Sequence, residues 1–212
     1  MYKGAIMPKK KTHKVIQQFE NSPVIPIVTF KEINSSLKIA EILIKEGLTN
    51  LEVTLRAPNA LTCIEAIAKE FPVANVGAGT IIRKEQLQQI KDVGWTFAVS
   101  PGFTKTMVEE ARRIEMPYLP GPSTPSEIIE LLELGVTFQK FFHAGNSGGY
   151  KMLEAYSNIF SEVKFCTTGG IGALDFTDYL KLDNVLCLGG SWMLPFKDVE
   201  MKVMIVSKIQ LI

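Results

Sequence analysis

The chain has 212 residues, a length that fits one domain well and two domains poorly. Hydrophobic residues make up 46% and charged residues 21%, an ordinary globular composition with enough apolar residues for a sizeable core. Residues 1–14 contain five lysines and no acidic residue, which leaves 18 of the 23 basic residues against all 22 acidic ones. Because phosphate backbones are bound by clustered Lys and Arg, this mildly acidic body argues against a nucleic-acid-binding protein.

No targeting or membrane segment is expected. Residues 1–14 lack the apolar stretch of a signal peptide, and no apolar run approaches membrane-spanning length. The two histidines, His13 and His143, have no second ligand at metal-binding spacing, so we expect no bound metal or other cofactor. An odd number of scattered cysteines predicts buried free thiols in a reducing cytoplasm. These cysteines are Cys63, Cys166 and Cys187.

Short β-rich apolar runs alternate along the chain with helical patterns, at a repeat of about two dozen residues. The expected strands are Val24–Phe30, Asn50–Leu55, Val73–Gly79, Phe97–Ser100, Tyr118–Leu119, Thr137–Phe142, Val163–Thr167 and Asn184–Leu188. The expected helices are Ser35–Glu46, Ala60–Glu70, Lys84–Val93, Thr104–Ile114, Ser126–Leu134 and Tyr150–Tyr156. Their ends are indicated by capping signals, such as Ser126 with Glu127 behind Pro125, and by C-terminal glycines.

Eight strands alternating with helices indicate parallel pairing, because each parallel crossover needs a helix. Even spacing, the count of eight, and polar or glycine-rich residues at several strand ends favour a closed barrel over an open doubly wound sheet. We therefore predict an α/β protein with a single (β/α)8 TIM barrel domain over residues 1–212. An extra N-terminal helix, Thr12–Glu20, would close the barrel floor, and Val199–Ile212 would form a final helix. Residues 1–11 fit a disordered basic tail or a first helical turn better than an anion-binding arm.

A lysine lies within the apolar strand Thr137–Phe142. Strand alternation puts Lys140 on one face with Phe138 and Phe142. Burial there disfavours the charged form of the amine. Lys140 is therefore either paired with a carboxylate across the barrel or kept partly neutral to attack a carbonyl, and the local pattern favours neither alternative.

The strand ending at Arg56 carries two opposite charges on one face. Glu52, Thr54 and Arg56 alternate with apolar residues, which would meet the helices and leave the polar set facing the barrel interior or its mouth. The charges are either a simple ion pair or an acid/base carboxylate beside a guanidinium that binds a keto acid's carboxylate. A buried ion pair is costly, so we favour the functional alternative.

Three glycine-rich segments end predicted strands. Val76-Gly-Ala-Gly-Thr80 allows close approach of backbone and ligand, with a hydroxyl at the rim, although a tight strand exit explains it equally. Thr167-Thr-Gly-Gly-Ile171 and Leu188-Gly-Gly-Ser-Trp192 follow the seventh and eighth strands, whose loops commonly bind phosphate in barrels. We predict a phosphate site there, formed by backbone dipoles and Ser191.

Together these motifs resemble the 2-keto-3-deoxy-6-phosphogluconate (KDPG) / 4-hydroxy-2-oxoglutarate (KHG) aldolase family, in order from about Val24 to Trp192. The matching segments are Pro23-Val-Ile-Pro26, Leu51-Glu-Val-Thr-Leu-Arg56, Val76-Gly-Ala-Gly-Thr80, Ser100-Pro-Gly102, Leu119-Pro-Gly121, Thr124-Pro-Ser-Glu127, Lys140-Phe-Phe142, Thr168-Gly-Gly-Ile171 and Gly189-Gly-Ser-Trp192. The combination is specific where each piece alone is not.

The resemblance implies a role for each matching position. Lys140 would be the Schiff-base lysine and Glu52 the general acid/base. The pyruvyl carboxylate would be bound by Arg56 and Thr80. The pocket would be lined by Pro101 and Phe142, and the phosphate would be held by Thr168, Gly169, Gly170 and Ser191.

The implied enzyme is a metal-independent class I aldolase, a carbon–carbon lyase that forms a homotrimer. It would cleave 2-dehydro-3-deoxy-6-phosphogluconate to pyruvate and glyceraldehyde 3-phosphate, with the cleavage of KHG to pyruvate and glyoxylate as a second candidate activity. The galactonate epimer is an alternative substrate. A phosphosugar isomerase or epimerase, with Glu52 as the base and Lys140 as an electrophile, is the rival enzyme. A non-catalytic phosphate-ligand barrel ranks last, because it has no need of the inward lysine.

The chain departs from the family pattern at three places. The family usually reads Lys-Phe-Phe-Pro-Ala, and His143 stands here where that proline would be. Thr167 stands where a proline precedes the Thr-Gly-Gly run, and Leu119-Pro-Gly-Pro122 carries an extra proline. His143 either lies near the rim and alters leaving-group contacts or is a surface substitution, and we expect the second.

Overall fold

The computed structural model describes Phe19 and residues 22–194. The strands are β1 (Val24–Val28), β2 (Asn50–Thr54), β3 (Asn75–Gly79), β4 (Phe97–Val99), β5 (Tyr118–Leu119), β6 (Phe138–Phe142), β7 (Lys164–Thr168) and β8 (Val185–Gly190). The helices are α2 (Ile33–Lys45), α3 (Ala60–Glu70), α4 (Lys84–Asp92), α5 (Lys105–Arg113), α6 (Pro125–Glu133), α7 (Gly149–Ile159) and α8 (Phe176–Leu180). A 3-10 turn, η1 (Ala144–Ser147), follows β6.

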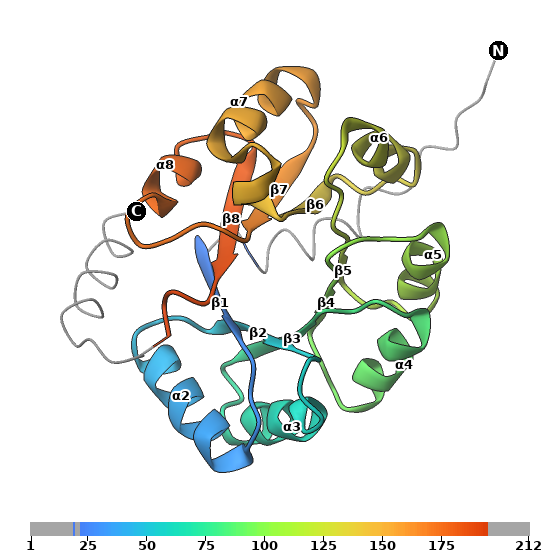
Figure 1. The fold of residues 1–212 in the computed structure, drawn as a ribbon. Coiled ribbons are helices and arrows are strands. Elements are labelled where there is room, and N and C mark those ends of the chain that lie inside the picture. The colour runs from blue at the N-terminus through green and yellow to red at the C-terminus, as the bar shows by residue number, and fades with distance from the viewer. Residues whose placement is uncertain (1–18, 20–21, 195–212) are drawn as a thin grey trace.

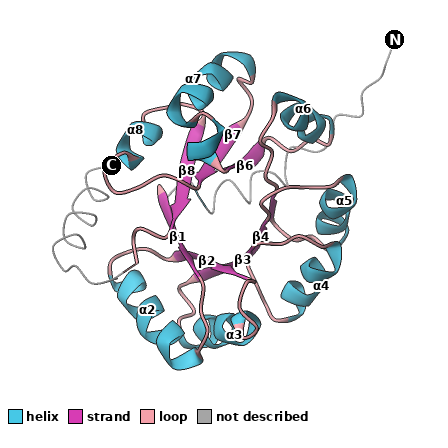
Figure 2. Cartoon of the chain, viewed as in Figure 1, coloured by secondary structure: helices cyan, strands magenta, loops and turns pink. Residues whose placement is uncertain are grey.

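The strands form a ring with the helices around its outside (Figures 1 and 2). The sheet runs in the order β5-β4-β3-β2-β1-β8-β7-β6, and every ladder between neighbours is parallel. Between the two end strands, the Lys140 N–H donates to the Pro120 carbonyl at 2.7 Å. The predicted (β/α)8 barrel is therefore confirmed, with a narrow join between β5 and β6.

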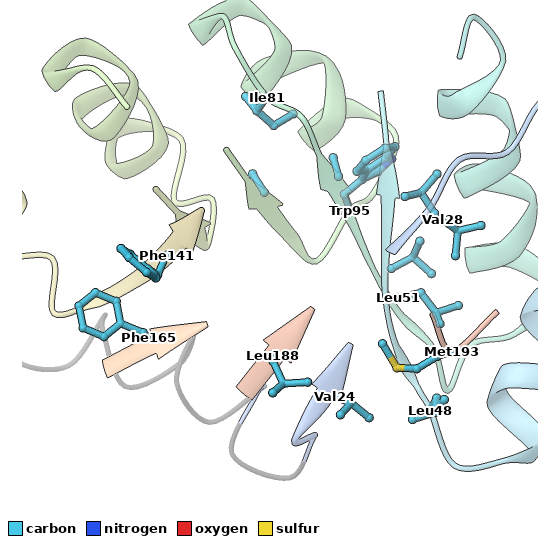
Figure 3. Packing of buried hydrophobic residues seen from close by; sticks show 14 of the residues in the cluster. Val24, Val28, Leu48, Leu51, Ile81, Trp95, Phe141, Phe165, Leu188 and Met193 are labelled. Carbon is cyan, nitrogen blue, oxygen red and sulfur yellow. The ribbon is translucent and has the colours of Figure 1, made fainter. Parts of the chain in front are cut away.

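Two apolar layers hold the barrel together. The outer one packs the sheet against the helices and includes Leu51, Phe141 and Phe165, each of which is fully buried (Figure 3). The inner one fills the barrel below the site, where the Phe19 ring packs edge-on against the Phe97 ring at 5.0 Å. Strand alternation divides the residues between the layers, so a polar side chain in the inner set points toward the barrel axis.

Of the predicted helices, Ala60–Glu70 has the expected bounds, and the others differ by one to three residues at one or both ends. Helix α6 begins at Pro125 rather than Ser126, because Thr124 is its N-cap. The Thr124 hydroxyl accepts from the Glu127 N–H, and the Glu127 carboxylate accepts from the Thr124 N–H at 2.8 Å, which completes a capping box.

The predicted strands all occur, with bounds that differ by no more than two residues at either end. Helix α8 was not predicted, because its five residues are too few to show a helical period. The predicted helices Thr12–Glu20 and Val199–Ile212, and the basic tail, lie essentially outside the described residues. Within the part of the chain that the structure describes, no helix is long and apolar enough to span a membrane.

Candidate active site

A cavity of about 520 Å³ opens among the carboxyl ends of the strands, where barrel enzymes place their sites. All ten residues singled out in the sequence line it, namely Glu52, Arg56, Thr80, Pro101, Lys140, Phe142, Thr168, Gly169, Gly170 and Ser191. The remaining lining residues are Ile27, Thr54, His143, Ile171, Gly189 and Gly190. Segments spread over most of the sequence thus meet in one space.

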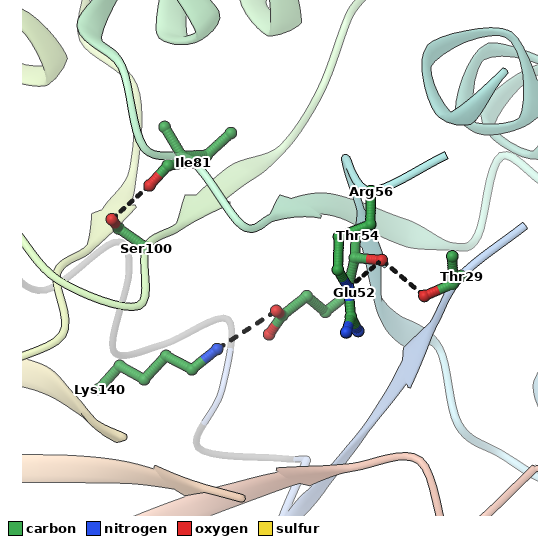
Figure 4. A network of polar contacts seen from close by, with 7 residues as sticks. All are labelled: Thr29, Glu52, Thr54, Arg56, Ile81, Ser100 and Lys140. Atoms are coloured by element: carbon green, nitrogen blue, oxygen red, sulfur yellow. Dashed lines mark hydrogen bonds and ion pairs between the residues drawn. The ribbon is translucent and has the colours of Figure 1, made fainter. Parts of the chain in front are cut away.

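Lys140 and Glu52 form a buried pair across the barrel. The Lys140 ammonium donates from Nζ to Glu52 Oε1 at 3.3 Å, and each side chain is 5% exposed (Figure 4). Nζ also lies 5.4 Å from the centroid of the Phe142 ring. The lysine therefore has a proton acceptor within hydrogen-bond reach in a nearly dry setting, an arrangement that suits a nucleophilic amine beside a base.

The glycines of β3 make room for this pair. A Cβ on Gly79 would lie 2.1 Å from Glu52 Oε1, and one on Gly77 would lie 2.1 Å from the Phe97 ring. Both distances are far below van der Waals contact, so no larger residue fits without displacing its neighbour. The sequence suggested that these glycines admit a ligand; in the structure the space is filled by the carboxylate and the ring.

Arg56 is held at the rim by a short chain of hydroxyl groups. Its Nε donates to Thr54 Oγ1 at 3.3 Å, and that hydroxyl is bonded to Thr29 Oγ1 at 2.7 Å (Figure 4). Strand alternation predicted that Thr54 faces inward, but the sequence alone suggested no function for it. Its position indicates a support that fixes the direction of the guanidinium.

Thr80 stands directly after β3 in an unusual backbone conformation. Its φ is +65°, a left-handed value that a β-branched residue rarely adopts. The next residue is tied down, because the Ser100 hydroxyl donates to the Ile81 carbonyl (Figure 4). Backbone strain of this kind persists where the surroundings enforce it and is frequent at functional sites.

The loops after β7 and β8 form the glycine-rich wall of the cavity. Gly169 and Gly170 have φ values of +94° and +73°, which favour glycine. The Gly169 carbonyl accepts from the Gly145 N–H at 2.8 Å, so the loop is anchored to η1. The Thr168 hydroxyl is buried in this wall and has no hydrogen-bond partner among the described residues, which is uncommon for a buried polar group.

His143 is not a surface substitution, and that expectation was wrong. It lines the cavity, half-buried, and its ring packs against the wall formed by Gly169 and Gly170. The chain leaves β6 through His143 directly into the 3-10 turn η1. A sequence pattern that ends with the strand does not report the direction of that turn.

The cysteines of the described residues lie outside this cavity. Cys63, Cys166 and Cys187 are buried free thiols, as predicted. Burial, followed by the neighbouring Cys166, raises the pKa of Cys187 well above its usual range, so this thiol is unreactive. Across residues 22–194 and Phe19, no three His, Cys, Asp or Glu side chains gather closely enough to hold a metal ion.

Comparison with known proteins agrees with this fold and site. A family model described as "Aldolase: KDPG and KHG aldolase" matches residues 15–208. The KHG/KDPG aldolase of Escherichia coli K12 is 43% identical over 178 residues, 84% of each chain. The 2-dehydro-3-deoxy-phosphogluconate aldolase of Pseudoalteromonas atlantica is 40% identical over 192 residues, 90% of this chain and 89% of its own.

Solved structures give the same result. The KDPG aldolase of Legionella pneumophila, with pyruvate captured as a covalent carbinolamine, has a TM-score of 0.84 and 39% identity, covering 92% of this chain and 95% of its own. The Zymomonas mobilis enzyme, solved with 3-phosphoglycerate, has a TM-score of 0.84 and 36% identity, covering 96% and 95%.

The (β/α)8 barrel, with a polar cavity at the carboxyl ends of its strands, and the matching family model identify a barrel enzyme of the aldolase class. The chain belongs to the KDPG and KHG aldolase family.

Proposed function

We propose that the protein is a class I aldolase that cleaves 2-dehydro-3-deoxy-6-phosphogluconate to pyruvate and glyceraldehyde 3-phosphate. The observation that carries the proposal is the Lys140–Glu52 pair, 3.3 Å apart and nearly dry beside a glycine-rich wall. A nucleophile, a base and a group that can accept phosphate are thereby collected in one cavity.

Lys140 begins the reaction by attacking the substrate's C2 carbonyl. The amine first gives a proton to Glu52, which lies within reach and is freed from its ion pair as the amine becomes neutral. Loss of water from the carbinolamine then gives a protonated imine. The Legionella pneumophila relative was solved with pyruvate as such a carbinolamine, which supports this step.

Glu52 then removes the proton of the C4 hydroxyl, directly or through a water molecule. The C3–C4 electron pair moves into the protonated imine, so the aldehyde leaves and an enamine of pyruvate stays on Lys140. Protonation at C3 and hydrolysis release pyruvate and restore the amine. We propose that no metal is needed, because the imine itself accepts the electron pair.

Two further groups of residues orient the substrate. Arg56 and Thr80 bind the carboxylate beside the ketone, and the hydroxyl support of Arg56 limits its motion. Pro101 and Phe142 enclose the pyruvyl portion. The phosphate is bound by the hydroxyl groups of Thr168 and Ser191 and by the backbone N–H groups of Gly169 and Gly170.

Borohydride trapping tests the proposal. Borohydride should reduce the imine that pyruvate forms with Lys140 to a stable secondary amine, which leaves a 1-carboxyethyl group on the lysine that peptide mapping locates. Lys164 on the neighbouring strand provides a matched control, because its ammonium donates to the Asp183 carbonyl outside the cavity. Lys140→Met should abolish the adduct and Lys164→Met should retain it. An adduct on another lysine, or none at all, would refute the assignment.

Glu52→Gln separates the two chemical steps. The variant should still form the adduct but should lose about 10²–10⁴-fold in cleavage rate, the usual contribution of a general acid/base. Unchanged cleavage would remove Glu52 from the mechanism. The rival isomerase or epimerase would form no imine with either protein, so the same trapping experiment excludes it or favours it.

Substrate choice within the family is tested by side-by-side turnover. The glycine wall supports a phosphorylated substrate over KHG, whose aldehyde product is glyoxylate, and the galactonate epimer would use the same wall. We further propose a homotrimer, on the strength of the family resemblance, and a cytoplasmic location, since the thiols are free and buried. Sedimentation equilibrium would measure the first.

A further inference from the structure

His143 packs its imidazole on the proposed phosphate wall. A Cβ built on Gly169 would lie 2.9 Å from the ring's Cγ and Cδ2, and one on Gly170 would lie 3.6 Å from Cε1. The ring thus lies along both glycines of the loop. It also packs beside the Phe142 ring, with centroids 5.0 Å apart.

The backbone around this histidine is held on both sides. The Ser123 hydroxyl donates to the Phe142 carbonyl, and the His143 carbonyl accepts from the N–H groups of Asn146 and Ser147 at 3.0 Å each. These bonds fix the backbone that carries His143, and the packing of the ring against Phe142 and Gly169 limits where the imidazole can lie in the cavity.

The polar atoms of the ring have no partner among the described residues. Nδ1 is buried without a hydrogen bond, so a proton on Nδ1 would create a buried unpaired N–H group. A ring with its proton on Nε2 avoids this unpaired N–H group, and its Nε2–H then has a hydrogen bond to offer. A donor held beside a proposed anion site and left unpaired indicates a ligand contact.

The glycine-rich wall has no charged side chain of its own to bind a phosphate. The cavity-lining residues at the ends of β7 and β8 are Thr168, Gly169, Gly170, Ile171, Gly189, Gly190 and Ser191, all of them uncharged. A phosphate bound there would contact only backbone N–H groups and hydroxyl groups of these loops. The imidazole of His143, which can carry a charge, lies against the same wall. Charged hydrogen-bond acceptors gain most from an added N–H donor.

We propose that His143 is a specificity-determining residue that donates a hydrogen bond from its imidazole to the substrate's phosphate. This inference rests on the proposed function, and it assigns to His143 a role that proline, which has no donor, cannot fill. The consequence is a preference for phosphorylated over unphosphorylated aldehydes that depends on one N–H group.

Two substitutions of similar size separate donation from packing. His143→Leu fills the space without a donor, whereas His143→Gln retains an N–H group near the position of Nε2. Both remove the aromatic ring, so a purely structural role would affect them alike. Thermal unfolding midpoints of the two variants should agree, which makes them a matched pair.

The assay is condensation of pyruvate with glyceraldehyde 3-phosphate and, separately, with glyoxylate. His143→Leu should lose at least about tenfold in kcat/KM for the phosphorylated aldehyde, mainly through KM, and much less for glyoxylate. His143→Gln should recover most of the loss. Inorganic phosphate, as a competitive inhibitor, should weaken by a similar factor in His143→Leu alone.

Equal losses on the two aldehydes, or equal behaviour of the two variants, would overturn the inference. Borohydride trapping with pyruvate distinguishes this failure from failure of the proposed function. An adduct on Lys140 in the unaltered protein and in both variants keeps the aldolase mechanism in place while the role of His143 is judged.

Discussion

Replacing Gly79 by alanine should damage catalysis by moving Glu52, without any change to a residue proposed to touch substrate. The added Cβ would lie 2.1 Å from Glu52 Oε1 and 2.8 Å from its Cδ and Cγ, whereas ordinary contact begins at 3.4 Å. The carboxylate is the flexible end of its side chain, so it would shift rather than unfold the strand. A shift of about 1 Å suffices to cost about 10²-fold in rate at a reacting centre.

Gly77→Ala is the matched control on the same strand and face. Its Cβ would lie 2.1–2.3 Å from three atoms of the buried Phe97 ring, deep in the inner core rather than in the cavity. Because an aromatic ring in a packed core cannot swing away, this variant should lose about 1–3 kcal/mol of stability. Its folded fraction should retain most of its turnover.

The two variants are compared by pyruvate release, measured with a coupled dehydrogenase, and by thermal unfolding followed by circular dichroism. Gly79→Ala should show low kcat with an intact borohydride adduct, since Lys140 is unchanged. A normal kcat in Gly79→Ala would refute the reasoning, as would an equal rate loss in Gly77→Ala at temperatures where it is fully folded.

Three further predictions concern the rim, a helix end and the glycine wall. Thr54→Val removes the hydroxyl that accepts from Arg56 Nε, and it should raise KM for pyruvate in condensation about threefold to tenfold with a smaller change in kcat. For Glu127, burial raises the carboxyl pKa but backbone N–H groups outweigh it, so the net pKa is below 4.5. Its capping contribution, about 0.5 kcal/mol at this partly exposed position, should be present above pH 4.5 and disappear as pH falls through the lowered pKa; urea unfolding of Glu127→Gln across pH measures this. Gly169→Ala would place an alanine at a φ of +94°, which alanine rarely adopts, with its Cβ 2.9 Å from the His143 ring. The loop should therefore shift, and activity on the phosphorylated substrate should fall more than activity on glyoxylate.

The barrel and the inward direction of the site residues could be predicted because both depend on short-range periodicity. Alternation alone placed Lys140 with Phe138, and Glu52 with Thr54, on interior faces, and the structure buries all four. Glycines and polar residues at the strand ends identified the mouth of the barrel. These predictions do not depend on knowing which strands lie opposite each other in the barrel.

Contacts between loops could not be predicted in the same way. The position of His143 against Gly169 depends on how the chain turns after β6 and where η1 meets the β7 loop, and neither follows from a repeat. The Thr54 hydroxyl that accepts from Arg56 is itself bonded to the hydroxyl of Thr29, which directly follows β1. Both are tertiary effects on residues whose local sequence is compatible with exposure.

Closure of the sheet is what turns these separate patterns into a reaction site. In the strand order, three strands lie between β2 and β6 in either direction, so Glu52 and Lys140 extend from opposite walls. In an open sheet, four steps of about 4.8 Å would separate those strands by about 19 Å, beyond the combined reach of the two side chains. Their 3.3 Å contact therefore requires a closed barrel, and the β5–β6 join through the Lys140 N–H fixes the lysine's own backbone at the point of closure.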